Sequence, residues 1–130
     1  MDNSVAVPEV LLTKAECLAR AGKVSDAAAI LTNLRTNRIT SNDTRTYTAA
    51  NILQYVLDDR RRELFLHGGL RLFDLKRLNK DLSTQVTITR TNVAGNTVLG
   101  TVIPGSNRYL LPFSANVLAA NPSIIQNSRQ

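Results

Sequence analysis

Four carboxylates in the middle of the chain are the groups best placed to do chemistry. They are Asp58, Asp59, Glu63 and Asp74. Two carboxyl groups on either side of a sugar ring can hydrolyse a glycosidic bond, one as general acid and the other as base or nucleophile. Each of these four, however, has an arginine or lysine within helical reach, such as Arg62 four residues after Asp58. Because a paired carboxylate stays ionised, it is a poor general acid, and a structural role is the better interpretation.

The other reactive groups form no catalytic or metal-binding pattern. The sequence has one histidine, His67, and one cysteine, Cys17, and no spacing favours a nucleophile–base–acid triad. The Gly68-Gly69 pair lacks the lysine and the Ser/Thr of a phosphate-binding loop. A metal ion held by His67 and Asp74 would still need further ligands. The sequence therefore predicts no enzyme activity, no metal and no cofactor.

The composition narrows the classes of ligand. The 130-residue chain has a net charge of +6, but its 16 basic residues are interspersed with 10 acidic ones. Mixed charge of this kind is typical of paired or solvated side chains, so no nucleic-acid partner is expected. Aromatic residues make up 5% of the chain and tryptophan is absent. That is a poor supply of the ring faces on which sugars and bases stack.

Two closely packed helices are predicted near the N-terminus. Pro8 in a first helical turn precedes apolar residues at helical spacing as far as Gly22. Ser25 then offers an N-cap for a second helix that runs to about Arg38. Small residues let two antiparallel helices approach closely, as in one tetratricopeptide-like unit: Ala15, Ala19, Gly22 and Ala27. One such unit cannot bury its own apolar face, so preceding repeats or the following helices must cover it.

Two further helices are predicted after a polar loop at 40–48. The third runs over 49–67 and is closed by Gly68 and Gly69, and the fourth runs over 70–78. At least one of the two glycines is expected to have positive φ, because the chain must stop and turn between the helices.

The rest of the chain is predicted to be less regular. Residues 85–103 alternate weakly, as in a β-hairpin or an ordered long loop. The tail from Tyr109 is predicted to be an irregular arm with one short helix, which Ser114 caps and Asn121-Pro122 ends. The fold class is therefore mainly α, and the length fits a single domain of residues 1–130.

Three segments, in order, resemble the SusD/RagB family. They are 18–35 (LARAGKVSDAAAILTNLR), 60–77 (RRRELFLHGGLRLFDLKR) and 109–127 (YLLPFSANVLAANPSIIQN). The Arg-Arg-Glu-Leu run that leads into Gly-Gly-x-Arg-x-Phe-Asp-Leu-x-Arg, and the Leu-Pro and Asn-Pro-x-x-x-Gln-Asn motifs near the end, are specific to that family. His67 stands where such proteins commonly carry an acid. The resemblance marks Arg60, Glu63, Gly68, Gly69, Arg71 and Asp74 as structural residues.

The resemblance implies a non-catalytic role in nutrient uptake. SusD/RagB proteins of Bacteroidetes-type bacteria are lipid-anchored on the cell surface, where they help to load oligosaccharides or other nutrients into a SusC-type TonB-dependent transporter of the outer membrane. Family members are several times longer than this chain, so the chain is expected to be a C-terminal portion without the signal peptide and lipid anchor. Family glycan sites lie largely outside the three matched segments, so no ligand-binding residue can be carried over.

Two other function classes remain open from the residues alone. A tetratricopeptide-like adaptor would bind a peptide in a helical groove, and the first 40 residues permit it. A basic nucleic-acid binder would need a one-sided positive face. The segments 60–77 and 109–127 favour the SusD/RagB interpretation over both.

The aromatic residues suggest that this chain is mainly scaffold. Phe65 and Phe73 fall among apolar neighbours in predicted helices and are expected in the core. Tyr109 and Phe113 flank Pro112 in the arm, whereas Tyr47 and Tyr55 are expected to be the exposed rings.

Arg60 is predicted to be a buried, paired arginine. Leu53, Val56, Leu57, Leu64 and His67 lie three, four or seven residues from it, which places it within the apolar stripe of the third helix. Glu63 or Asp74 is the expected partner. Arg60→Ala should therefore lower the free energy of unfolding by about 3 to 5 kcal/mol, because the partner would be left buried and unpaired. Denaturant unfolding checks this, and an unchanged midpoint would contradict it.

Overall fold

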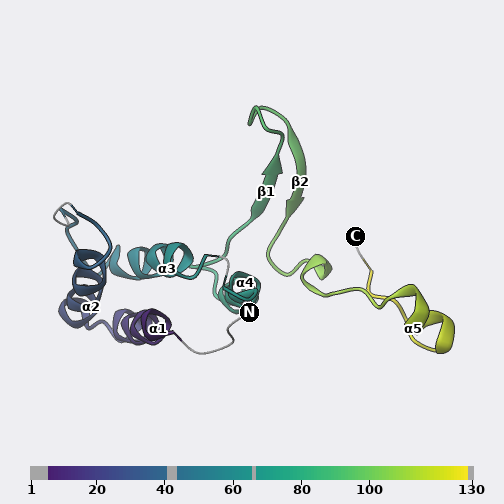
Figure 1. Ribbon diagram of the computed structural model, residues 1–130, viewed down its shortest axis with the longest axis horizontal. Coiled ribbons are helices and arrows are strands. Elements are labelled where there is room, and N and C mark those ends of the chain that lie inside the picture. The colour runs from purple at the N-terminus through teal and green to yellow at the C-terminus, as the bar shows by residue number, and fades with distance from the viewer. Residues whose placement is uncertain (1–5, 41–43, 66, 129–130) are drawn as a thin grey trace. The chain divides into compact units, whose positions relative to one another are not determined.

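The computed structural model describes residues 6–40, 44–65 and 67–128. Within these ranges the chain forms five α-helices, one 3-10 helix and a two-stranded sheet (Figure 1). The mainly α prediction is confirmed. The chain falls into two compact units, Met1–Arg71 and Leu72–Gln130.

The first unit begins with the predicted helical hairpin. Helix α1 spans Val7–Arg20 with Pro8 in its first turn, and helix α2 spans Val24–Thr36. Gly22, at φ 74°, ends α1: its N–H donates to the Ala19 carbonyl and the next N–H, of Lys23, donates to the Leu18 carbonyl. These two bonds form a Schellman motif. The predicted Ser25 cap is wrong, because α2 begins one residue before Ser25 and its N-cap residue, Lys23, makes no side-chain capping bond.

Helix α3 spans Ile52–Glu63 and is shorter than predicted at both ends. At its start the side chain of Asn51 bonds the backbone at Thr46 and Thr48, which holds the chain in a turn. At its end the Leu64 N–H donates to the Arg60 carbonyl, and the helix stops at Glu63, five residues before Gly68. The predicted loop at 40–48 and helix at 49–67 lie partly outside the described residues, at 41–43 and 66.

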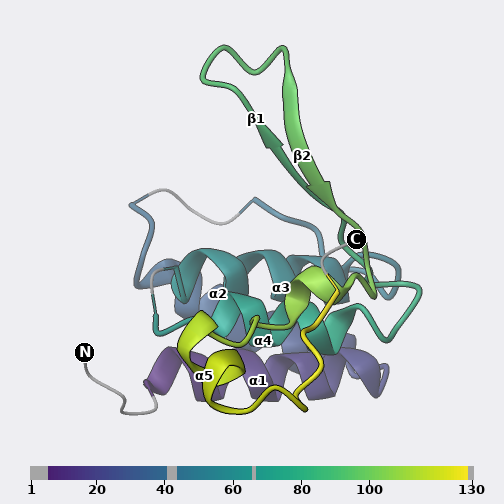
Figure 2. The same cartoon turned by 90° about the vertical axis from the view of Figure 1, so that its right-hand side faces the viewer.

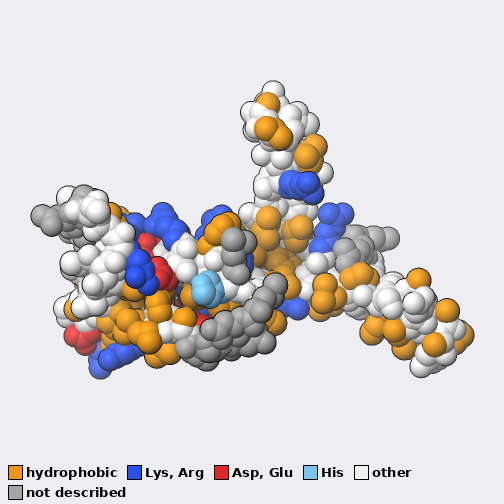
Figure 3. Space-filling model, viewed as in Figure 1, with side chains coloured by type: hydrophobic (Ala, Val, Ile, Leu, Met, Phe, Trp, Pro, Cys, Tyr) orange, Lys and Arg blue, Asp and Glu red, His pale blue; other side chains and the backbone are white. Residues whose placement is uncertain are grey.

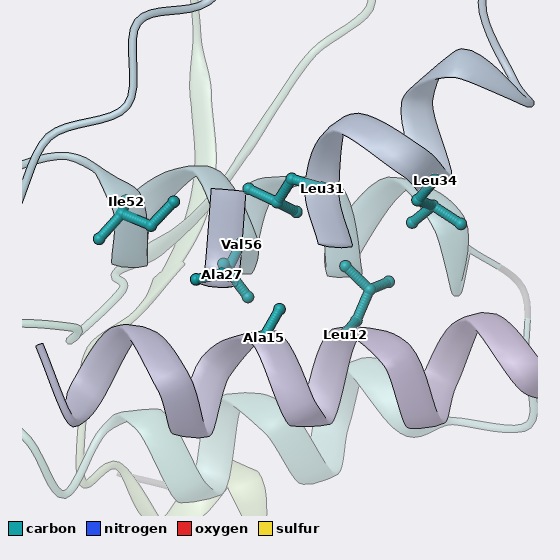
Figure 4. Close-up of a cluster of buried hydrophobic side chains, with 7 residues drawn as sticks. All are labelled: Leu12, Ala15, Ala27, Leu31, Leu34, Ile52 and Val56. Atoms are coloured by element: carbon teal, nitrogen blue, oxygen red, sulfur yellow. The ribbon is translucent and has the colours of Figure 1, made fainter. Parts of the chain in front are cut away.

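Helices α1, α2 and α3 enclose one apolar core (Figure 4). Seven buried side chains from the three helices make it up: Leu12, Ala15, Ala27, Leu31, Leu34, Ile52 and Val56. Ala15 and Ala27 are fully buried, and both are small enough to let α1 and α2 approach closely. α3 packs against both helices of the hairpin. The following helix therefore covers the face that one tetratricopeptide-like unit cannot bury by itself.

Helix α4 (Leu70–Leu78) crosses the boundary between the two units and has the predicted bounds. The segment after it folds back on its C-terminus through side-chain hydrogen bonds. The buried Thr84 hydroxyl donates to the Leu78 carbonyl, 3.0 Å away, and the Asn79 side chain accepts from the Val86 N–H. The Leu78 carbonyl is one of the acceptors that a helix end leaves without an intrahelical partner.

The predicted hairpin is confirmed. Strands β1 (Ile88–Thr91) and β2 (Val98–Val102) pair antiparallel, with Ile88 opposite Val102 and an irregularity between Arg90 and Thr91 (Figure 2). Asn92 organises the connection, because its side chain bonds the N–H groups of Asn96 and Thr97.

The C-terminal segment contains a 3-10 helix, η1 (Asn107–Tyr109), and a short helix, α5 (Ala115–Ala120). The Ser114 hydroxyl accepts a hydrogen bond from the Val117 N–H, which confirms the predicted cap. Many apolar side chains of the second unit are exposed, and Figure 3 shows hydrophobic groups along the hairpin and the C-terminal segment.

Gly68 and Gly69 form the turn between α3 and α4. Their φ angles are 47° and 80°, so the prediction of positive φ is confirmed at both positions. The Leu70 N–H donates to the His67 carbonyl and closes the turn. Positive φ at both central positions is the pattern of a type I′ turn, which strongly favours glycine.

Gly69→Ala should lower the free energy of unfolding by about 1 kcal/mol or more, because alanine at φ 80° is strained. The loss is purely conformational, since a Cβ at this position would meet no atom within 4 Å. Gly100→Ala is the matched control: that glycine also has open space but no positive φ. Equal denaturation midpoints for the two variants would contradict the explanation.

Candidate functional site

A buried carboxylate on α3 gathers arginines from three parts of the first unit. The Asp59 side chain, 7% exposed, accepts hydrogen bonds from Arg35 on α2, from Arg45 in the segment before α3, and from Arg62 one turn further along α3. The N–O distances are 3.3, 3.1 and 3.0 Å. A buried charge is tolerated when it is paired and hydrogen-bonded, and Asp59 has three such partners. We call these four residues the Asp59 cluster.

Aromatic rings extend the Asp59 cluster toward the core. The guanidinium carbon of Arg45 lies 4.7 Å from the centroid of the Tyr55 ring, a cation–π distance. Tyr55 in turn meets Tyr47 edge to face, with ring centroids 5.7 Å apart. Both tyrosines are partly buried against the core. The prediction that they are the exposed rings of the chain is therefore wrong: their faces are used to fix the segment before α3.

Arg60 is buried, as predicted, with 8% of its surface exposed. Its guanidinium donates to the Thr13 hydroxyl at 3.1 Å and lies 3.9 Å from the Glu9 carboxylate, so it joins α3 to α1. Glu63, one of its two predicted partners, accepts hydrogen bonds from Arg38 instead. That hydrogen bond, and then the coulombic attraction of the same carboxylate, raise the pKa of Arg38.

The remaining predicted structural residues lie around α4. Asp74 is buried and pairs with Arg77, 3.1 Å away and one turn along the helix. It belongs to the second unit, and its pairing with Arg60 stays a prediction. Arg71 lies half-buried in the first turn of α4, directly after the Gly68-Gly69 turn.

Two phenylalanines expected in the core are on the surface. Phe65 is 73% exposed and Phe73 is 63% exposed. Phe65 falls in the turn after α3, and its spacing of seven residues from Asp58 and nine from Val56 places it on the exposed side of that helix, opposite the core. Tyr109 is buried, whereas Phe113 is 43% exposed.

Phe65 contributes to a shallow open pocket along α3. The pocket has a volume of ≈ 540 Å³ and is lined by Asp58, Arg61, Arg62 and Phe65. Asp58 is half-buried and accepts a hydrogen bond from Gln54, whereas Arg61 is exposed. The pocket adjoins the Asp59 cluster, because Arg62 belongs to both.

Neither a metal centre nor a membrane span is found in the described part of the chain. Across residues 6–40, 44–65 and 67–128, no three His, Cys, Asp or Glu side chains gather where they could hold a metal ion. None of the described helices combines the length and the apolar character needed to cross a bilayer.

Comparison with known proteins identifies the family. The model of the SusD family matches residues 7–129, nearly the whole chain. The chain belongs to the SusD family. Neither the curated proteins nor the solved structures give a significant match. SusD-family proteins are generally non-catalytic nutrient-binding proteins associated with the outer membrane.

The SusD-type ending of the chain has a clear structural use. The Gln126 side chain bonds both the N–H and the carbonyl of Phe113, each at 3.0 Å, and the Asn127 side chain donates to the Leu111 carbonyl. These side-chain amides therefore bond the backbone of the extended Leu111-Pro112 segment and of Phe113, as a neighbouring β-strand would. Asn121, before Pro122, accepts from the backbone and hydroxyl of Ser123 and shapes the turn after α5.

The arginines that join the Asp59 cluster from other elements, Arg35 and Arg45, were not predicted, because they are 24 and 14 residues away from Asp59; only Arg62 lay within helical reach. One signal was available. Asp59 is three residues from Val56 and seven from Ile52, which places it on the same buried face of α3.

Asp59→Ala should lower the free energy of unfolding by about 3 kcal/mol, because it leaves the guanidiniums of Arg35 and Arg45 largely buried without their shared carboxylate. Asp58→Ala is the matched control. It removes the neighbouring carboxylate, which bonds only Gln54 among the described residues, and should change stability by about 0.5 kcal/mol or less. Urea unfolding of both variants measures the two free energies of unfolding, and equal decreases would disprove a special role for Asp59.

Proposed function

We propose that this chain is part of a non-catalytic, cell-surface subunit that captures glycans or other nutrients and delivers them to a SusC-type TonB-dependent transporter. The observation that carries the proposal is the SusD family match over residues 7–129. Within such a subunit the chain acts mainly as scaffold. The complete protein is proposed to be lipid-anchored in the outer membrane.

The packing of the first unit supports a scaffold role. Three helices share one apolar core, and charged side chains lock their ends together: Arg60 joins α3 to α1, and the Asp59 cluster joins α3 to α2. Most of these side chains are buried, so they hold the frame rather than contact a ligand. A rigid frame of this kind positions binding loops supplied by other parts of a protein.

The transporter partnership is tested by genetics and purification. The gene should lie beside one for a TonB-dependent transporter, and the two proteins should co-purify from outer membranes. A transporter that loads the nutrient equally well without this protein would refute the delivery role.

The scaffold role predicts that the 130-residue chain alone does not bind neutral oligosaccharides with micromolar affinity, whereas the complete protein does. The chain has no tryptophan, and two of its three tyrosines pack against its own core, so it cannot build an extended aromatic platform. Titration calorimetry of both proteins against one panel of neutral oligosaccharides checks this. Comparable micromolar binding by the two would move the nutrient site into these 130 residues.

A further inference from the structure

The pocket along α3 combines three kinds of chemical group on one rigid surface. Its lining residues, Asp58, Arg61, Arg62 and Phe65, are spaced i, i+3, i+4 and i+7. They therefore follow one face of α3 and the turn that ends it. Groups carried by a helix keep their spacing better than groups on a loop, and a binding site requires that constancy.

Phe65 supplies an apolar platform. It lines the pocket and 73% of its surface is exposed to solvent. The face of an aromatic ring carries partial negative charge and attracts C–H groups, so the ring can take the apolar face of a sugar.

The arginines supply a site for an anion. The guanidinium of Arg61 makes no hydrogen bond or ion pair with any other described side chain. Arg62 is bonded to Asp59 but is 63% exposed, which leaves donors directed to solvent. A guanidinium matches the planar geometry of a carboxylate or the oxygens of a sulfate.

The surrounding charge favours an anion as well. Among the described residues that line the pocket, the two guanidiniums of Arg61 and Arg62 outnumber the one carboxylate of Asp58. The excess positive charge attracts an anion to the pocket.

Asp58 restricts which anion fits. Its carboxylate oxygens accept hydrogen bonds and repel other anions, so a bare inorganic anion would meet repulsion there, whereas a ligand with hydroxyl groups would donate to it. The ligand must therefore present hydroxyls, an apolar face and one anionic group. We propose that this pocket binds a sugar residue that carries a carboxylate or a sulfate. The choice of a glycan among hydroxylated acids rests on the proposed function.

The test is a titration of the isotopically labelled 130-residue chain, followed by the NMR shifts of its backbone amides. The probes are methyl glucuronide, methyl glucoside 6-sulfate, neutral methyl glucoside, sodium acetate and sodium sulfate. The two charged sugars should shift amides of residues 58–65 with dissociation constants on the order of 1 mM, as expected for ligands of about a dozen heavy atoms. Comparison of the two identifies carboxylate or sulfate as the preferred group. The neutral sugar and the two simple anions should each bind about tenfold more weakly.

Two pairs of variants locate the site. Phe65→Ala and Arg61→Gln should each weaken binding of the charged sugar roughly fivefold or more. Phe73→Ala and Arg90→Gln are the matched controls. Phe73 is also largely exposed, at 63%, Arg90 is an exposed arginine, and both lie in the second unit. They should leave binding unchanged. The amide spectrum of each variant verifies its fold.

Several results would overturn the proposal. If the neutral and the charged sugars bound with equal affinity, the pocket would have no anion site. If acetate or sulfate bound as tightly as the charged sugars, the sugar ring would contribute nothing to binding. Tighter binding of a glutamate-rich peptide than of either charged sugar would assign the pocket to a protein partner. Absence of charged-sugar binding would refute the pocket proposal and leave the transporter partnership untouched. Conversely, a chain that binds the charged sugar but is dispensable for uptake would refute the proposed function alone.

Discussion

The first unit depends on one constraint, that a carboxylate withdrawn from water must be matched by cations. Asp59 lies on the buried face of α3 beside Val56 and Ile52, where its charge would be strongly unfavourable if left alone. The unit meets this requirement with guanidiniums from α2, from the segment before α3 and from α3 itself. Because these arginines are distant from one another in the sequence, pairing them with Asp59 also fixes the positions of α2, the segment before α3, and α3 relative to one another. The apolar core supplies the attraction between the helices, and the Asp59 cluster selects one arrangement among them.

The three consecutive arginines of α3 show how a helix separates similar residues into different tasks. Each residue is rotated by about 100° from the previous one. Arg60 consequently points to α1, Arg62 reaches Asp59 on its own helix, and Arg61 is left in solvent at the pocket. The run that looks like one basic patch in the sequence therefore contains two arginines with structural contacts, of which Arg62 stays largely exposed, and one arginine, Arg61, without a described side-chain partner.

The sequence predicted features that arise from local rules and missed those that arise from distant contacts. The bounds of α4, the Gly68-Gly69 turn, the hairpin and the Ser114 cap follow from propensity, backbone conformation and capping within a few residues. For Asp59 and Glu63, the sequence missed the partners that come from other elements: Arg35, Arg45 and Arg38. Phe65 was misplaced because its apolar neighbours were weighed above its helical position, which is on the side of α3 opposite Val56. The two tyrosines were predicted to be exposed by elimination of the other rings, whereas their burial is decided by Arg45 and the core.

A scaffold that also carries one weak charged-sugar pocket is physically coherent. A pocket that holds a single residue at about millimolar affinity has little effect by itself. When it shares a polysaccharide with a second site on the same protein, binding at the second site becomes intramolecular, with an effective concentration in the millimolar range for short connections. The pocket would then be about half-occupied whenever the main site is, and each contact would add selectivity for chains with a charged residue at the matching distance. A position on a rigid helix favours this arrangement, because the gain is greatest when the distance between the two sites does not fluctuate.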